Sequence, residues 1–125
     1  MLFNFSCSDL NFDVVVVGGG TSGVASAIQS SRLGSKTLLI EESNWLGGML
    51  TSAGVSAVDG NYKMPSGFLK EFRDSLVSYY GHLDSLKTGW VSNFMFEPSV
   101  GNRILKDIAK QENNLTILYG STVSE

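Results

Sequence analysis

The stretch Asp13-Val-Val-Val-Val-Gly-Gly-Gly-Thr-Ser-Gly23 decides the fold of this chain. Its four consecutive valines, residues 14–17, predict a strand buried on both faces, as in a parallel sheet, because β-branched side chains point to both sides. Three glycines end the strand, and apolar residues then recur at helical spacing from Thr21 to Leu33. Gly34 is typical of a helix C-terminus. The stretch therefore predicts a strand, a tight turn and a helix in direct succession.

A second apolar strand, Thr37–Ile40, follows the helix and ends at Glu41. A strand, a helix and a strand within about 30 residues form a βαβ unit, whose strands lie parallel. We therefore predict an α/β fold with a Rossmann-like βαβ dinucleotide-binding unit on a parallel sheet. Further along the chain, we predict a long loop at residues 43–60, a helix at residues 66–80 and another helix from residue 98 onward. We also predict a strand at residues 115–119 and the opening of another strand at residues 121–125.

The domain organisation follows from these elements. Residues 1–11 are predicted to be a flexible N-terminal segment, and residues 12–125 a single nucleotide-binding domain. Because the chain stops as a further strand opens, we expect this domain to be truncated, with an incomplete sheet that lacks its C-terminal part. An apolar sheet edge without a partner predicts poor solubility for the isolated chain.

The turn itself has the pattern G-x-G-x-x-G, which is formed by Gly18, Gly20 and Gly23. In a dinucleotide-binding turn, the first glycine allows the tight turn, the second lets a pyrophosphate approach the backbone, and the third lets the helix pack against the strand. The helix N-terminus offers free N–H groups and a positive dipole end to the phosphates. Thr21 and Ser22 are candidates for additional hydroxyl donors. The alternative is a glycine-rich turn in an α/β protein that binds no nucleotide.

An acidic residue at the end of the second strand can accept hydrogen bonds from the ribose hydroxyls of an adenine dinucleotide. The spacing favours Glu41, which follows Gly23 by 18 residues, over Glu42, which is predicted to lie in the next loop. A carboxylate at this position also disfavours the 2′-phosphate of NADP. The alternative for Glu41 is a solvated carboxylate at a strand end.

The glycine turn does not distinguish FAD from NAD, because both contain an ADP half. The next segment, Asn44-Trp-Leu-Gly-Gly-Met-Leu-Thr51, favours FAD. Its glycine pair, Gly47 and Gly48, allows a second close approach of backbone to pyrophosphate or ribityl oxygens. Thr51 is predicted to donate a hydrogen bond to one of these oxygens.

At these residues the chain resembles the FAD-dependent oxidoreductases with a glutathione-reductase-type Rossmann fold. The resemblance rests on Leu39-Ile-Glu41 followed by Leu46-Gly-Gly-Met49 and Thr51, on Phe96-Glu-Pro98 before a helix, and on the strand Thr116–Tyr119 with Gly120. It extends from about residue 12 to residue 123, and it departs from the family pattern at Thr37, where valine is usual. The resemblance implies FAD as the cofactor. It also implies a non-covalent flavin, because Met49 stands where some flavoproteins place a histidine that bonds to the flavin. In such proteins further cofactor contacts and the substrate domain lie beyond the part of the sequence present here.

Composition excludes several classes of function. Nine Lys and Arg against twelve Asp and Glu give a net charge of −3, and the basic residues are scattered, which argues against a nucleic-acid partner. No apolar run reaches the roughly 20 residues that a membrane span needs. Cys7 is the only cysteine, and no cluster of metal ligands is visible. We expect a cytoplasmic protein without a metal site whose partner is a small-molecule substrate of unknown identity.

Catalytic residues are not identified by the sequence. His82 is the only histidine, and without a recognisable partner it is interpreted as a cation near a helix end rather than a proton shuttle. Trp90, Phe94 and Phe96 are predicted to be core or interface aromatics. The favoured function is the FAD-binding portion of a flavin-dependent oxidoreductase. The alternatives are a non-catalytic module that binds NAD or another adenine nucleotide, and an inactive truncated product.

Overall fold

The centre of the molecule is a three-stranded parallel sheet with the strand order β1-β2-β3. The strands are β1 (Val14–Val17), β2 (Thr37–Glu41) and β3 (Leu115–Tyr119). Val14 of β1 pairs with Thr37 of β2, which in turn pairs with Leu115 of β3. The predicted α/β fold with a parallel sheet is therefore confirmed. The computed structural model describes residues 11–60, 62–90 and 92–124, so residues 1–10 of the predicted N-terminal segment lie outside the described residues.

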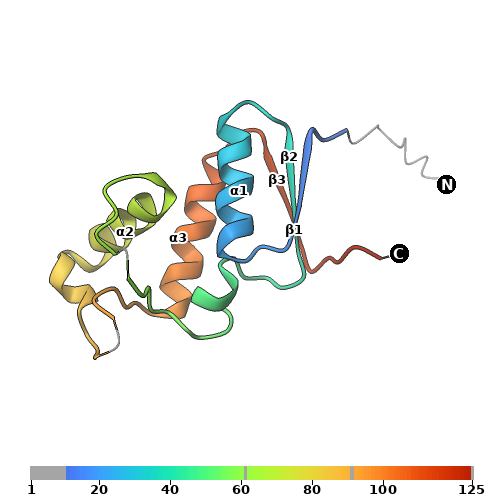
Figure 1. Ribbon diagram of the computed structural model, residues 1–125. Coiled ribbons are helices and arrows are strands. Elements are labelled where there is room, and N and C mark those ends of the chain that lie inside the picture. The colour runs from blue at the N-terminus through green and yellow to red at the C-terminus, as the bar shows by residue number, and fades with distance from the viewer. Residues whose placement is uncertain (1–10, 61, 91, 125) are drawn as a thin grey trace, which may run out of the picture.

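The three α-helices of the described residues lie on one side of this sheet (Figure 1). α1 (Thr21–Arg32) connects β1 to β2, while α2 (Gly67–Tyr80) and α3 (Pro98–Lys110) lie between β2 and β3 in the chain. α1 and α3 cover the sheet, and α2 lies farther from it (Figure 1). The most deeply buried side chains between these layers are apolar: Val24, Ala27, Ile28, Leu39, Leu46, Phe72, Leu76, Leu86, Phe94 and Leu105. Among the described helices, none is both long and apolar enough to span a bilayer.

The opposite face of the sheet is open, which corrects the prediction that the valine strand is buried on both faces. Val15 and Val17 of β1 are 54% and 64% exposed, and Leu118 of β3 is 46% exposed. β1 also lies at the edge of the sheet formed by the described residues, paired with β2 alone. The sequence run is apolar on both faces, but the helices of the described chain cover only one of them.

We expect the isolated chain to self-associate because of this open face and free edge. Val15→Thr combined with Leu118→Thr places threonine, a β-branched residue that favours strands, at both positions and removes apolar surface. The double variant is therefore expected to raise the monomer fraction measured by analytical ultracentrifugation. Val24→Thr, at a fully buried position of α1, serves as the control and is expected to lower the melting temperature instead. A monodisperse, cooperatively melting wild-type monomer would contradict this expectation.

Arg32 ties the three helices together at the end of α1. Its guanidinium donates two hydrogen bonds of 2.7 Å to the carboxylate of Glu71 on α2, and a third of 2.7 Å to Glu112, just after α3. These hydrogen bonds hold the pKa of the Glu71 carboxyl below its ordinary value. The outer helix α2 is therefore anchored to α1, which covers the sheet, by a bidentate ion pair in addition to apolar packing.

Arg32→Met is expected to lower the free energy of unfolding by about 1–2 kcal/mol, because two partly buried carboxylates lose their partner. The measurement is urea unfolding, and a double-mutant cycle with Glu71→Gln isolates the coupling between the two side chains. Lys70→Met is the matched control, since Lys70 pairs with Asp74 within α2 itself. Equal losses of unfolding free energy for Arg32→Met and Lys70→Met would show that the ion pair between helices stabilises the fold no more than one within a helix.

Outside the sheet layer, α2 is followed by the short helix η2 (Leu83–Leu86) and an irregular segment. Phe94 and Phe96 of that segment are buried against Phe72 of α2, with ring centroids 6.2 and 5.3 Å away, as predicted for core aromatics. Trp90 is not a core residue, because its side chain is fully exposed, so for Trp90 the interface alternative stays a prediction. Ala57 of the long loop and Met95 of this segment pair in an isolated antiparallel bridge. This bridge links the long loop to the outer layer.

Candidate cofactor-binding site

The glycine turn lies between the end of β1 and the start of α1. Gly18 has φ = +95°, a conformation that side chains disfavour, and its N–H donates to the carbonyl of Ile40 on β2 at 2.8 Å. Gly20 is the N-cap of α1, whose first helical hydrogen bond runs from the Val24 N–H to the Gly20 carbonyl at 2.9 Å. The N–H groups of Thr21, Ser22 and Gly23 precede this hydrogen bond and have no helical partners. They point out of the first turn at the positive end of the helix dipole.

The three motif glycines are required for different reasons. A Cβ on Gly23 would lie 1.9 Å from the carbonyl oxygen of Gly18, so glycine is needed there for α1 to pack against β1. A Cβ on Gly20 would meet no protein atom within 4 Å, and its φ of −62° is open to every residue type. Nothing in the described protein therefore requires glycine at position 20.

Glu41 ends β2 with its carboxylate turned towards the glycine turn. One carboxylate oxygen accepts the Gly19 N–H at 2.6 Å, and the other accepts the N–H and the hydroxyl of Ser43 at 2.8 and 2.6 Å. The side chain is 8% exposed, and burial alone raises a carboxyl pKa. The hydrogen bonds from Ser43 and Gly19 outweigh that burial and lower the pKa of Glu41 below its ordinary value. The carboxylate is thus held ionised beside the turn.

The glycine pair of the following loop packs directly against the turn. Gly47 donates to the carbonyl of Gly19 at 2.8 Å, and the hydroxyl of Thr21 donates to the carbonyl of Gly47 at 2.9 Å. A Cβ on Gly48 would lie 3.0 Å from the Cα of Gly20. The two glycine segments therefore form one wall, and the predicted approach of Gly47 and Gly48 to oxygens of FAD stays a prediction.

Two predicted hydroxyl donors have other partners in the structure. Thr51 is 1% exposed and donates to the carbonyl of Leu46 at 2.6 Å, so its predicted hydrogen bond to FAD does not fit this geometry. Its hydroxyl closes the loop around the short helix η1 (Gly48–Leu50) instead. The hydroxyl of Thr21 is committed to Gly47 in the same way. Ser22, by contrast, lies exposed in the first turn of α1.

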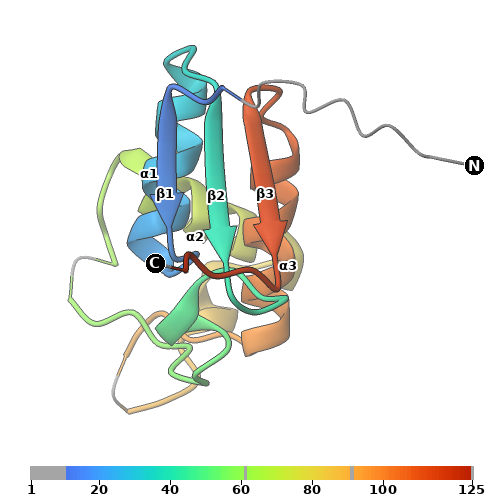
Figure 2. The ribbon, with the colours of Figure 1, turned by 90° about the vertical axis from the view of Figure 1, so that its right-hand side faces the viewer.

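A cleft of about 420 Å³ opens at the carboxyl ends of β1 and β2, within the size range of small-molecule sites. The chain after β3 forms its far wall, because residues 120–124 turn back across the strand ends towards β1 (Figure 2). The Ser121 N–H donates to the carbonyl of Glu41 at 3.0 Å, and the described residues of this segment form no strand, which corrects the prediction for 121–125. The lining residues are Val17, Gly18, Gly20, Ile40, Glu41, Glu42, Ser43, Gly48, Ser52, Ser121, Thr122 and Val123.

The structure therefore brings four of the predicted site residues to one cleft: Gly18, Gly20, Glu41 and Gly48. The other five do not line it: Thr21, Ser22, Gly23, Gly47 and Thr51. Sequence reasoning missed Ser43 and Ser52, for which a hydroxyl near a glycine loop was the available signal. It also missed Ser121–Val123, whose position depends on how the chain turns after β3.

Asn102 of α3 is a further residue that the sequence did not reveal. Its side-chain oxygen accepts the N–H of Leu46 at 2.9 Å and so fixes the start of the glycine pair. Lys106, one turn later, donates to the carbonyl of Asn44. Both residues hold the loop from a helix more than 50 positions away in the chain, so no local pattern pointed to them.

His82 and Glu97, the acidic residue of the Phe96-Glu-Pro98 segment, lie elsewhere on the surface. His82 is exposed, and its Nδ1 accepts the N–H of Asp84 at 3.0 Å at the start of η2. Glu97 is exposed before α3. Neither lines the cleft at the strand ends.

Comparison with known proteins identifies the family of this chain. Residues 13–125 match the family described as FAD dependent oxidoreductase. The chain is 30% identical over 91 residues to the carotenoid phi-ring synthase of Chlorobaculum tepidum, covering 73% of this chain and 13% of the synthase. It is 42% identical over 69 residues to the glutathione reductase of Debaryomyces hansenii, covering 54% of this chain and 14% of the reductase. The chain thus spans only a small part of these relatives.

Solved structures share the fold at low sequence identity. The p-nitrophenol 4-monooxygenase PnpA of Pseudomonas putida superposes with a TM-score of 0.52 at 16% identity, covering 90% of this chain and 32% of the monooxygenase. THI4 of Thermovibrio ammonificans gives a TM-score of 0.50 at 17% identity, covering 89% of this chain and 39% of THI4. The match over residues 13–125 is decisive for the family, whose cofactor is FAD: this chain belongs to the FAD-dependent oxidoreductases.

Proposed function

We propose that this chain is the part of a flavin-dependent oxidoreductase that holds the ADP half of a non-covalent FAD in the cleft at the strand ends. The observation that carries the proposal is the space at Gly20. A side chain there would meet no protein atom, yet glycine occupies the position in the cleft wall at a helix N-terminus. A ligand whose phosphates contact the backbone explains both facts.

The pyrophosphate is assigned to the turn of Gly18 and Gly20. The first N–H groups of α1 donate to its oxygens, and the helix dipole favours its negative charge. No basic side chain lines the cleft, so backbone donors supply the phosphate contacts in the described residues. Gly48 and Ser52 continue the cleft wall away from this turn and are assigned to the path towards the flavin.

The adenosine ribose is assigned to Glu41. The ionised carboxylate accepts three hydrogen bonds within the protein, and a carboxylate has about four lone-pair sites, so it retains capacity for a ribose hydroxyl. The same carboxylate repels a 2′-phosphate and so favours FAD over a cofactor that carries one. Residues 121–123 form the opposite wall and are assigned to the adenine side.

FAD, when bound, supplies the redox chemistry, and the protein binds and orients it. Met49 is largely exposed next to the glycine pair and has no nucleophile to attach a flavin, which supports non-covalent binding. Within this proposal no acid or base is assigned, since no titratable side chain other than Glu41 and Glu42 lines the cleft.

The test is purification of the chain with FAD supplied. A visible flavin spectrum that stays with the protein on gel filtration, and passes to the supernatant on acid precipitation, supports non-covalent FAD binding. Colourless protein that binds NAD in calorimetry would instead favour the nucleotide-binding module without redox function. Failure to bind either dinucleotide would overturn the proposal.

A further inference from the structure

A small pocket lies in the outer part of the molecule, away from the cleft at the strand ends. Its volume is about 210 Å³, and it is formed by the loop before α2, by α2 itself and by the segment around η2. It shares no lining residue with the cleft. Its lining residues are Tyr62, Lys63, Arg73, Leu83, Lys87 and Asn93.

The lining is strongly cationic for a chain with a net charge of −3. Three of its six side chains are positively charged, none is a carboxylate, and Asn93 adds an amide. Clustered like charges repel one another, and this repulsion is relieved by an anion between them. The concentration of positive charge around a small hollow is therefore the feature that requires an explanation.

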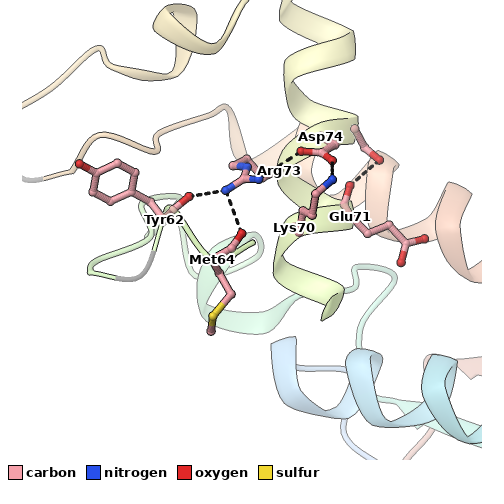
Figure 3. A network of polar contacts seen from close by, with 7 residues as sticks. Tyr62, Met64, Lys70, Glu71, Arg73 and Asp74 are labelled. Atoms are coloured by element: carbon pink, nitrogen blue, oxygen red, sulfur yellow. Dashed lines mark hydrogen bonds and ion pairs between the residues drawn. The ribbon is translucent and has the colours of Figure 1, made fainter. Parts of the chain in front are cut away.

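Arg73 is the fixed member of this group. One terminal nitrogen of its guanidinium donates to the carbonyls of Tyr62 and Met64 at 2.7 and 3.1 Å, and the other donates to Asp74 at 3.4 Å (Figure 3). Asp74 is shared with Lys70, so the local charge stays positive. An arginine has five N–H groups, and these contacts use three of them. The remaining N–H donors of Arg73 are held in place because the guanidinium group is planar and rigid.

The two lysines are less committed. The Nζ of Lys63 lies 5.7 Å from the centre of the Tyr62 ring, and no described carboxylate lies within ion-pair distance of it. Lys87 pairs with Asp84 at 2.6 Å, and Asp84 is itself exposed and outside the pocket lining. Asp74 and Asp84 thus each pair with one of the three cations, whereas Lys63 pairs with no described carboxylate. An entering anion competes with the exposed Lys87–Asp84 pair and with the longer Arg73–Asp74 contact, both of small energy.

We propose that this pocket binds the oxyanion group of a small ligand, either a phosphate or a carboxylate, between Lys63, Arg73 and Lys87. Its volume is below the range of whole cofactor sites and suits a single anionic group or a small molecule that carries one. Arginine and lysine provide complementary recognition, a planar fork and two mobile point charges. The proposal is independent of FAD binding, since the two sites share no residue.

The experiment is a calorimetric titration of the full chain with inorganic phosphate and, separately, with succinate, each against sodium chloride at equal ionic strength. Lys63→Met and Lys87→Met are each expected to weaken binding about fivefold, the effect of one partly screened charge. Asp84→Asn is expected to strengthen binding by about the same factor, because it frees Lys87. The matched controls are Lys110→Met and Asp107→Asn on α3, which change the net charge equally and lie outside the pocket lining.

Opposite shifts for Lys87→Met and Asp84→Asn, with unchanged controls, support the site. Tighter binding of phosphate than of succinate assigns a phosphate-bearing ligand, and the reverse assigns a carboxylate. The proposal is overturned by the absence of binding heat beyond the chloride reference, or by equal effects of the control variants. It is also overturned if saturating FAD abolishes phosphate binding, which would place the anion in the glycine turn. A chain that binds phosphate in this way but binds no FAD would refute the proposed function alone.

Discussion

Gly20→Ala is expected to abolish most FAD binding while leaving the fold intact. The added methyl group meets no protein atom and the backbone φ of −62° accepts alanine, so the free energy of unfolding should change by no more than about 1 kcal/mol. The same methyl group occupies the space assigned to the pyrophosphate. We expect a loss of about 3 kcal/mol in FAD binding, a factor on the order of 100 in Kd. Fluorescence titration of FAD and urea unfolding of the apoprotein measure the two effects separately.

Gly23→Ala is the matched variant, only three residues away and chemically identical. Its methyl group would lie 1.9 Å from the carbonyl oxygen of Gly18, so α1 must move away from β1. We expect the free energy of unfolding to fall by about 3 kcal/mol or more. The pair of variants thus separates a glycine required by the ligand from one required by the fold. If Gly20→Ala retained wild-type FAD affinity, the assignment of the pyrophosphate to this turn would be wrong.

Glu41→Gln is expected to weaken both the fold and the cofactor site. The amide group replaces one carboxylate oxygen, so at least one N–H donor, from Gly19 or Ser43, faces another donor. Because the site is buried, we expect a loss of about 1–3 kcal/mol in stability. FAD affinity should fall about tenfold, since a ribose hydroxyl then donates to a neutral acceptor rather than an ionised one.

The same carboxylate predicts how stability depends on pH. Its pKa in the folded protein is lowered below the ordinary value of 4.5, because the hydrogen bonds from Ser43 and Gly19 outweigh burial. Its contribution is therefore complete above about pH 4.5 and is lost as the pH falls through the folded pKa. The wild type should lose stability below pH 4.5, whereas Glu41→Gln starts lower at pH 7 and has a flatter acid limb. Urea unfolding at several pH values measures both curves.

Glu42→Gln is the control for this experiment. Glu42 is the adjacent residue, lines the same cleft and is exposed. We expect its removal to leave stability unchanged within about 0.5 kcal/mol and to alter FAD affinity far less than Glu41→Gln. If Glu42→Gln alone lost FAD affinity, the ribose would belong to Glu42.

The elements of the fold could be predicted closely because their signals are local. The strand Leu115–Tyr119 has the predicted bounds. Both ends of α1 and of α2 lie within one residue of the bounds predicted for these helices. The glycine spacing and the position of Glu41 were also local signals, since each motif residue has a stereochemical reason that its neighbours in the chain reveal. Gly18 and Glu41 accordingly reach the same cleft.

The errors came from properties that depend on distant segments. The valine strand is apolar on both sides, but the burial of Val15 and Val17 depends on which face of the sheet the helices pack against. Thr51 follows a glycine pair, as a ligand-binding hydroxyl does in the expected pattern, but the fold of its own loop directs the hydroxyl to Leu46. Residues 121–124 have strand-like composition, yet they cross the strand ends rather than extend the sheet.

By itself, the sequence determined the βαβ unit, the glycine turn and the acidic end of the second strand, because strand burial, helix periodicity and glycine stereochemistry act over a few residues. Only the tertiary structure decided which hydroxyls are free, which wall the C-terminal segment forms, and that Lys63, Arg73 and Lys87 surround one pocket. These arrangements join residues tens of positions apart. They result from the packing of whole helices, which no local pattern encodes.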